Sequence, residues 1–250
     1  MIKEESIRQL RELRLPELVD VLNEGNRQNL YTDMTFDEAL EIVIQDLYET
    51  KTNDKINRLI KYARFRYQTA EKQNMLYLEK RDFDKKKINE LCTLQFMKDG
   101  TNLVIEGLTG SGKSFVSNVI GLEACKRLYK TRYIRVPDLL YATDLEVSGI
   151  RGSARLLDKF GKYDLLILDE WMQDDPYTPL QVHFLLELTE RRYLQHSTIY
   201  CTQFPQSSWS TCLGENAHSE AIIDRIIHNK IKIQMGEINM REELGKINIK

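Results

Sequence analysis

The chain of 250 residues is poor in residues that interrupt or cross-link a fold, with 12 glycines, 5 prolines and 4 cysteines. So little glycine and proline excludes a collagen-like or low-complexity chain. The four cysteines lie far apart without a CxxC pair, which excludes a disulfide framework and a zinc-finger pattern. No apolar run approaches the ~20 residues of a membrane-spanning helix, and the charged N-terminus lacks the apolar core of a signal peptide. These absences predict a cytoplasmic protein without membrane contact.

The net charge of −2 hides an uneven distribution along the chain. Residues 1–50 carry 12 acidic and 5 basic side chains, whereas residues 51–87 carry 5 acidic and 12 basic ones. The remaining residues are nearly balanced. Because the positive charge is concentrated in one segment, the near-neutral total does not exclude binding to nucleic acid.

The apolar periodicity changes character along the chain. Residues 1–75 show helical spacing and predict a small all-α N-terminal domain, whose long helix follows a capping box at Thr35 and Glu38 and runs towards Tyr67. In residues 76–250, short apolar runs alternate with helical patterns, which indicates an α/β domain with a parallel sheet flanked by helices. The expected strands are NLVIEG, TRYIRV, YDLLILDE, STIYCT and KIKIQM.

The first expected strand leads into a glycine-rich phosphate-binding pattern, GxxxxGK[ST]. Its glycines let backbone N–H groups wrap an anion at the N-terminus of the following helix. In this motif Lys113 reaches the β- and γ-phosphates of ATP and Ser114 ligates Mg²⁺. A glycine-rich turn that merely opens a buried helix is the weaker interpretation, because strand and helix both flank the loop. The predicted ATP-binding residues are Gly107, Leu108, Thr109, Gly110, Ser111, Gly112, Lys113, Ser114 and Phe115.

The third expected strand ends in two carboxylates, Asp169 and Glu170. Buried parallel strands read as continuous apolar runs, and α/β sheets bind ligands at the carboxyl ends of their strands. We therefore expect Asp169 to hold Mg²⁺ together with Ser114, and Glu170 to polarise the attacking water. An ordinary strand followed by an acidic turn would look similar, but the phosphate loop upstream favours nucleotide hydrolysis.

Three further features are candidates for catalysis. Thr202 and Gln203 end the fourth strand, where they would meet the γ-phosphate or the attacking water, or would simply be a satisfied hydroxyl and amide. Arg225 projects away from the apolar side of a predicted helix, as either an arginine finger for a neighbouring subunit or a solvated side chain. The same two interpretations apply to Arg241.

In order and spacing, these segments resemble the IstB family of helper ATPases in insertion-sequence transposition. That family is related to the DnaC helicase loaders within the AAA+ class. The similarity spans nearly the whole chain and is carried by five segments. They are LRELRLPEL, the phosphate loop, DLLILDE, CTQFPQSSW and AIIDRIIHNKIKIQMGEINMR. The chain departs from the family where Asp-Asp-Phe-Gly is usual and it has Asp-Glu-Trp-Met, at residues 169–172.

The resemblance implies a role for each candidate. Gln203, with Thr202 in place of the family's serine, falls at the sensor position. Arg225 falls at the trans-acting arginine finger and Arg241 near the second sensor arginine. The implied protein is an AAA+ ATPase that uses ATP and Mg²⁺, forms a homo-oligomer on double-stranded DNA and assists a cognate transposase. A DnaC-like replicative helicase loader and a small-molecule P-loop kinase are the alternatives.

Two basic clusters are candidates for DNA contact. The first lies opposite the apolar side of the long helix, and a one-sided basic face suits DNA phosphates. Such faces are also commonly solvated or paired with acidic segments. The first cluster is Lys51, Lys55, Arg58 and Arg66. The second precedes the acidic strand, where the resemblance implies an extra DNA-binding helix, and is formed by Arg151, Arg155 and Lys159.

Overall fold

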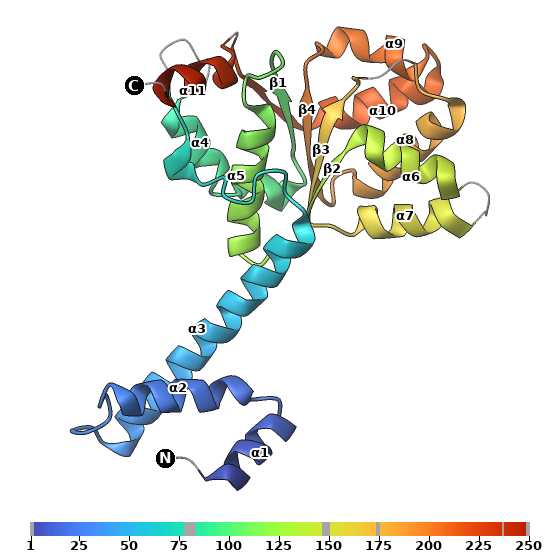
Figure 1. The fold of residues 1–250 in the computed structure, drawn as a ribbon. Coiled ribbons are helices and arrows are strands. Elements are labelled where there is room, and N and C mark those ends of the chain that lie inside the picture. Colours follow the sequence, from blue (N-terminus) through green and yellow to red (C-terminus); the bar gives the residue numbers. More distant parts are fainter. Residues whose placement is uncertain (1–2, 78–83, 147–150, 174–175, 237, 249–250) are drawn as a thin grey trace. The chain divides into compact units, whose positions relative to one another are not determined.

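The computed structural model describes residues 3–77, 84–146, 151–173, 176–236 and 238–248. The chain forms two compact units, residues 1–58 and 59–250, which are described separately. Figure 1 shows the helices and strands in sequence colours. Within the described part of the chain, the structure contains no helix that is both long and apolar enough to cross a membrane.

The first unit is helical, as predicted, and buries few side chains. Its helices are α1 (Glu4–Glu12), α2 (Pro16–Arg27) and the first part of α3 (Phe36–Ala63). The capping box at the start of α3 is present: the Thr35 N–H donates to Glu38 Oε2 at 2.8 Å and the Glu38 N–H donates to Thr35 Oγ1 at 3.4 Å. These two bonds satisfy backbone donors that the first helical turn leaves without partners.

Helix α3 ends sooner than predicted. Ala63 is its last residue, because Arg64 adopts a left-handed backbone with φ of 55° and Phe65 then turns into the apolar core. Arg66 therefore lies beyond the helix, contrary to the prediction that it belongs to the basic face of α3. The packing of residues 59–75 places them in the second unit, whereas the sequence suggested a domain boundary at residue 75.

The second unit contains the five predicted strands in one parallel sheet, with the order β2-β3-β4-β1-β5 (Figure 1). Strand β4 thus lies between β1, which leads into the phosphate loop, and β3, which carries the two carboxylates. The strands are β1 (Asn102–Glu106), β2 (Thr131–Arg135), β3 (Leu165–Trp171), β4 (Ser197–Thr202) and β5 (Lys230–Gln234).

Helices cover both faces of this sheet, which explains why its central strands are continuously apolar. Along β3, Leu165 and Ile167 pack into the core beside α5, whereas Leu166 and Leu168 pack into the core beside α6, α7, α8 and α10. The helices are α4 (Lys85–Leu91), α5 (Lys113–Lys126), α6 (Val136–Glu146), α7 (Arg151–Gly161), α8 (Pro179–Arg192), α9 (Trp209–Leu213), α10 (Ala217–His228) and α11 (Met240–Asn248). Short 3₁₀ helices span Lys72–Asn74, Gln95–Asp99 and Gln206–Ser208.

Candidate nucleotide-binding and hydrolysis site

The phosphate loop connects the carboxyl end of β1 with the N-terminus of α5. Gly110 and Gly112 have φ of 83° and 93°, a left-handed backbone that glycine adopts without the strain of a Cβ atom. The Lys113 ammonium donates to the carbonyl oxygens of Gly107 at 2.6 Å and Leu108 at 2.9 Å, so it lies within the curve of the loop. Burial lowers the pKa of Lys113, while nearby Asp169 acts in the opposite direction.

The beginning of α11 closes one side of the loop. The Met240 N–H donates to the Gly110 carbonyl at 2.9 Å, and Asn239 accepts from the Arg241 N–H at 3.1 Å. A Cβ atom at Gly110 would lie 2.3 Å from Asn239 Oδ1, so this close approach also requires glycine. Arg241 is thereby held in the wall of the cavity next to the loop.

An apolar cavity opens from the loop on the side of α5. The Tyr67 and Phe115 rings meet edge to face at 5.8 Å between centroids, and the Tyr67 N–H donates to Asn118 Oδ1 at 2.9 Å. Apolar walls next to an anion-binding loop suit the base and ribose of a nucleotide. The lining residues outside the loop are Arg66, Tyr67, Asn74, Met75, Leu76, Met240 and Arg241. Sequence reasoning missed those before β1, because no motif marks them.

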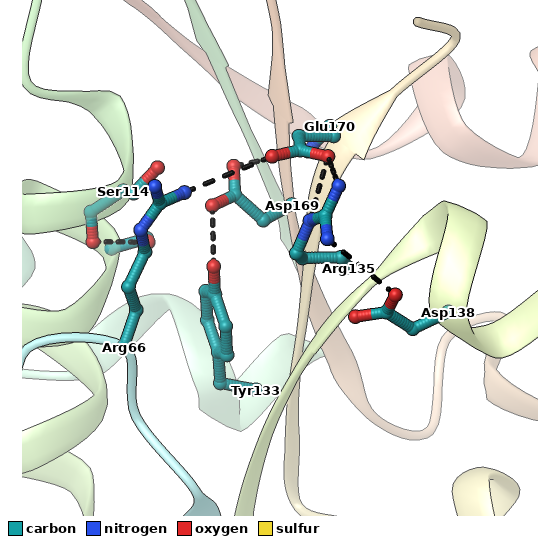
Figure 2. Close-up of polar contacts among 8 residues, drawn as sticks. Arg66, Ser114, Tyr133, Arg135, Asp138, Asp169 and Glu170 are labelled. Carbon is teal, nitrogen blue, oxygen red and sulfur yellow. Dashed lines mark hydrogen bonds and ion pairs between the residues drawn. The ribbon is translucent and has the colours of Figure 1, made fainter. Parts of the chain in front are cut away.

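The acidic end of β3 lies close to the phosphate loop (Figure 2). Asp169 is 2% exposed, and its carboxylate accepts from the Tyr133 hydroxyl at 2.6 Å and from the Glu170 N–H at 3.0 Å. Tyr133 lies on the neighbouring strand β2 and is 7% exposed. Burial, followed by the Asp169 charge, raises the pKa of Tyr133, so its hydroxyl remains a donor.

Glu170 has an irregular backbone and two cationic partners. Its φ of 58° places it in the left-handed region, where the register between β3 and β4 shifts. Such a conformation costs a residue with a Cβ atom about 1–2 kcal/mol. The carboxylate accepts from Arg135 at 2.7 Å (Nε) and 2.6 Å (Nη2), and Arg66 Nη1 lies 3.7 Å from Oε1. Figure 2 shows the two arginines on either side of Glu170.

The end of β4 also reaches the phosphate loop. The Thr109 hydroxyl donates to Gln203 Oε1 at 2.6 Å, which fixes the Gln203 side chain beside the loop. Thr202, by contrast, is 1% exposed, and its Oγ1 accepts from the Phe204 N–H at 3.1 Å. Its hydroxyl therefore holds the turn after β4, and a catalytic role of Thr202 stays a prediction.

Arg225 lies far from this edge of the sheet. It forms an ion pair with Glu190 of α8 and donates to the Ala221 carbonyl at 3.0 Å. Beside it lie Asn102 and Thr198, near the amino ends of β1 and β4. The phosphate loop follows the carboxyl end of β1. Arg225 and the phosphate loop therefore lie at opposite ends of the parallel strands. Arg225 therefore does not join the site of its own chain.

The predicted DNA-contacting residues are divided between the two units. Arg66 pairs with Glu170 at the candidate site, and Lys51 lies 3.4 Å from the Glu17 carboxylate. Lys55 and Arg58 are exposed on α3, as are Arg155 and Lys159 on α7. The side chain of Arg151 lies outside the described part of the structure.

This combination of fold and site defines an AAA+ P-loop ATPase. The phosphate loop, the acidic strand end and the end of β4 converge at one edge of a five-stranded parallel sheet, with β4 between β1 and β3. Over residues 8–245 the chain matches the model of a family described as IstB-like ATP binding protein, and it belongs to this family of ATP-binding proteins.

Relatives and solved structures agree with this assignment. The chain is 26% identical to the putative insertion sequence ATP-binding protein y4uH of Sinorhizobium fredii, over 96% of each chain. It is 31% identical to y4pL of the same organism, over 82% of each. The fold is similar to DnaI (TM-score 0.56, 19% identity, 69% of this chain and 91% of that one). It is also similar to the DnaC helicase loader (TM-score 0.52, 15% identity, 66% and 96%).

Proposed function

We propose that this ATPase assembles on double-stranded DNA and assists the transposase of an insertion sequence, with ATP hydrolysis controlling the assembly. The observation that carries the proposal is that the candidate catalytic residues are divided between the carboxyl and amino ends of the parallel strands. Lys113, Asp169, Glu170 and Gln203 gather at one edge, whereas Arg225 lies at the other. One chain thus supplies a pocket and a separate arginine, which suits a site completed between neighbouring copies.

Magnesium fits the donors next to the loop. Ser114 offers a hydroxyl and Asp169 a carboxylate with unused lone pairs, and Mg²⁺ prefers such oxygen ligands. Within the described residues, no cluster of three or more His, Cys, Asp or Glu side chains forms a complete metal cage. This agrees with an ion held by one or two protein oxygens together with nucleotide phosphates and water. An ion held there by Ser114 and Asp169 would supply positive charge to neutralise the phosphates.

The protein groups have distinct roles in hydrolysis under this proposal. Loop N–H groups and Lys113 bind the phosphates, and Gln203, held by Thr109, faces the γ-phosphate. Glu170 accepts a hydrogen bond from the attacking water and orients it in line with the phosphorus. Arg241 adds positive charge from the wall of the cavity. Arg225 of a neighbouring copy stabilises the transition state, an effect worth about 10³–10⁵ in rate for such arginines.

The DNA part of the proposal rests on exposed basic side chains and on the relatives. Lys55 and Arg58 on α3 and Arg155 and Lys159 on α7 are exposed and thus accessible to phosphates. The relatives are described as insertion sequence ATP-binding proteins, which favours a transposition role over the helicase-loader alternative. Contacts between such side chains and DNA phosphates give affinity without sequence preference.

Mixing two inactive variants tests the site between copies. We expect Glu170→Gln to bind ATP without hydrolysing it, and Arg225→Ala to do the same for a different reason. An equimolar mixture should regain activity, because some interfaces join a pocket with intact Glu170 to a neighbour with intact Arg225. The measurement is phosphate release with DNA present, together with the mass of the assembly under an ATP analogue that resists hydrolysis.

The matched control is Arg191→Ala, which removes an exposed arginine on α8 that forms an ion pair with Asp158. Without any second variant present, Arg191→Ala should be as active as the unmodified protein. A mixture of Glu170→Gln and Arg225→Ala that stays inactive although both variants bind ATP and assemble on DNA would contradict the proposal. Full activity of Arg225→Ala alone would contradict it as well.

A further inference from the structure

Tyr133 contacts the acidic end of β3 from a different strand. Its hydroxyl lies 2.6 Å from Asp169 Oδ2, and both side chains are almost fully buried, at 7% and 2% exposure. Figure 2 shows the phenol pointing directly at the Asp169 carboxylate. A buried polar pair of this kind is stable only when its hydrogen bonds are made. The contact is therefore a fixed part of the candidate site.

The sheet register creates this contact. In the β2–β3 ladder, Tyr133 pairs with Ile167 and Arg135 pairs with Asp169. Alternate residues of a strand point to the same face, so Ile167 and Asp169 both face α5. The Tyr133 ring packs with Ile167 in the core on that face, and its length carries the hydroxyl one step further along the strand to Asp169.

Both oxygens of the Asp169 carboxylate have a donor. Tyr133 donates to Oδ2, and the Glu170 N–H donates to Oδ1 at 3.0 Å. The two donors come from paired strands, so the plane of the carboxylate cannot rotate freely. A carboxylate has about four lone-pair positions in total, so each oxygen keeps capacity for a metal or for its water shell.

We propose that Tyr133 is a positioning residue for magnesium, because it holds Asp169 in the orientation that presents the free lone pairs of its carboxylate towards Ser114. This inference rests on the proposed nucleotide hydrolysis and deepens it. Groups that hydrogen-bond a metal-binding side chain change metal affinity by about 10- to 100-fold when they are removed.

The alternative is a purely structural hydroxyl, which satisfies a buried carboxylate without affecting the metal. The two differ in what Tyr133→Phe changes. A structural hydroxyl affects the unfolding transition and leaves the magnesium requirement as it was. A positioning hydroxyl shifts the magnesium requirement, while binding of nucleotide in the absence of metal stays the same.

The experiment compares the full-length protein with Tyr133→Phe and with Tyr200→Phe as the matched control. Tyr200 is also buried, on β4, and its hydroxyl interacts with Thr198 near the amino end of that strand. Binding of a fluorescent ADP is titrated first in EDTA and then against increasing Mg²⁺ or Mn²⁺. We expect Tyr133→Phe to bind ADP normally in EDTA and to need about 10-fold more metal for the metal-dependent gain. Tyr200→Phe should need as much metal as the unmodified protein.

A double-mutant cycle with Asp169→Asn separates the metal effect from any loss of stability. If Tyr133 acts through Asp169, adding Tyr133→Phe to Asp169→Asn should not weaken metal dependence further. The inference would be overturned if Tyr133→Phe left the metal requirement unchanged. It would also be overturned if Tyr133→Phe raised the metal requirement as much in Asp169→Asn as in the otherwise unmodified protein. If the unmodified protein binds nucleotide without any metal-dependent gain, the magnesium assignment itself fails, which is a different result.

Discussion

Glu170 shows how one residue is constrained by several neighbours at once. It combines a left-handed backbone with an ion pair to Arg135 and a longer contact to Arg66. A carboxylate that accepts two charge-assisted hydrogen bonds from one guanidinium has fewer lone pairs for a water molecule. Both of these bonds go to Oε2, so the pair with Arg135 restrains the position of the Glu170 carboxylate in the conformation described.

Removing this arginine should release the carboxylate. We expect Arg135→Ala to hydrolyse ATP several-fold faster than the unmodified protein when no DNA is present, measured as steady-state phosphate release. The control is Asp138→Ala, which removes the other partner of Arg135, at 3.5 Å, and leaves the pair with Glu170 in place. A slower Arg135→Ala enzyme would show that the arginine assists catalysis instead of restraining it.

Among single residues, the sequence predicted best those that belong to a motif with a known chemical requirement. The positions of Lys113, Asp169 and Glu170 follow from the phosphate loop and the acidic strand end, and the structure brings them to one edge. Arg135 and Tyr133 carry no such signal, since they act only through the register of β2 against β3. The sequence alone could not reveal that register.

Arg192 joins several elements at the amino edge of the sheet. This last residue of α8 is 3% exposed and donates to Thr198 Oγ1 at 2.8 Å and to the carbonyls of Ser197 at 2.6 Å and Tyr163 at 2.7 Å. It also donates to the Phe160 carbonyl at 3.0 Å. One guanidinium thereby ties the end of α7, the approach to β3 and the start of β4 to α8. Burial lowers its pKa to about 10, so it remains charged at neutral pH.

Replacing this side chain should destabilise the second unit. Arg192→Lys keeps the charge but cannot reach all of these acceptors, because an ammonium lacks the planar fork of a guanidinium. We expect the free energy of unfolding to fall by about 3 kcal/mol, since buried acceptors lose their donors. Chemical denaturation measures the change. The neighbouring Arg191→Lys should cost under about 1 kcal/mol, as its pair with Asp158 is exposed; equal losses would contradict this account.

Elements were predicted more completely than their ends. The five strands of the sheet lie where short apolar runs between helical patterns predicted them. The capping box correctly marked the start of α3. The end of α3 was missed, because its apolar spacing continues to Tyr67. The chain leaves the helix at Arg64 so that Phe65 can pack against Gly121, where a Cβ atom would lie 2.5 Å from the ring. Tertiary packing thus overrode the local pattern.

For the whole molecule, the uneven charge of the chain is the feature with a measurable consequence. Lys55 and Arg58 are exposed on α3, within the segment that carries the excess of basic residues. We expect Lys55→Ala combined with Arg58→Ala to weaken DNA binding and to reduce the slope of log K against log salt by about 2, since each phosphate contact contributes about 0.9. Fluorescence anisotropy with labelled duplex DNA at several salt concentrations measures both effects.

The control for charge alone is Lys98→Ala combined with Lys130→Ala. Both lysines are exposed in the second unit and belong to neither α3 nor α7: Lys98 lies in the 3₁₀ helix Gln95–Asp99, and Lys130 directly precedes β2. Their loss changes the net charge by the same amount as the loss of Lys55 and Arg58. Because they are not among the proposed DNA-contacting residues, the salt slope should change little. Equal slopes for the two double variants would place the DNA elsewhere on the protein.

The amino-acid sequence by itself determined the order of elements, the phosphate loop and the paired acids. These depend on local periodicity and on chemistry within short segments. Only the tertiary structure decided that Gln203 touches the loop, that Arg225 lies at the opposite edge, and that Tyr133 and Arg135 hold the two acids. Such contacts join residues far apart in the chain, and they arise from strand order, register and burial, which no local pattern specifies.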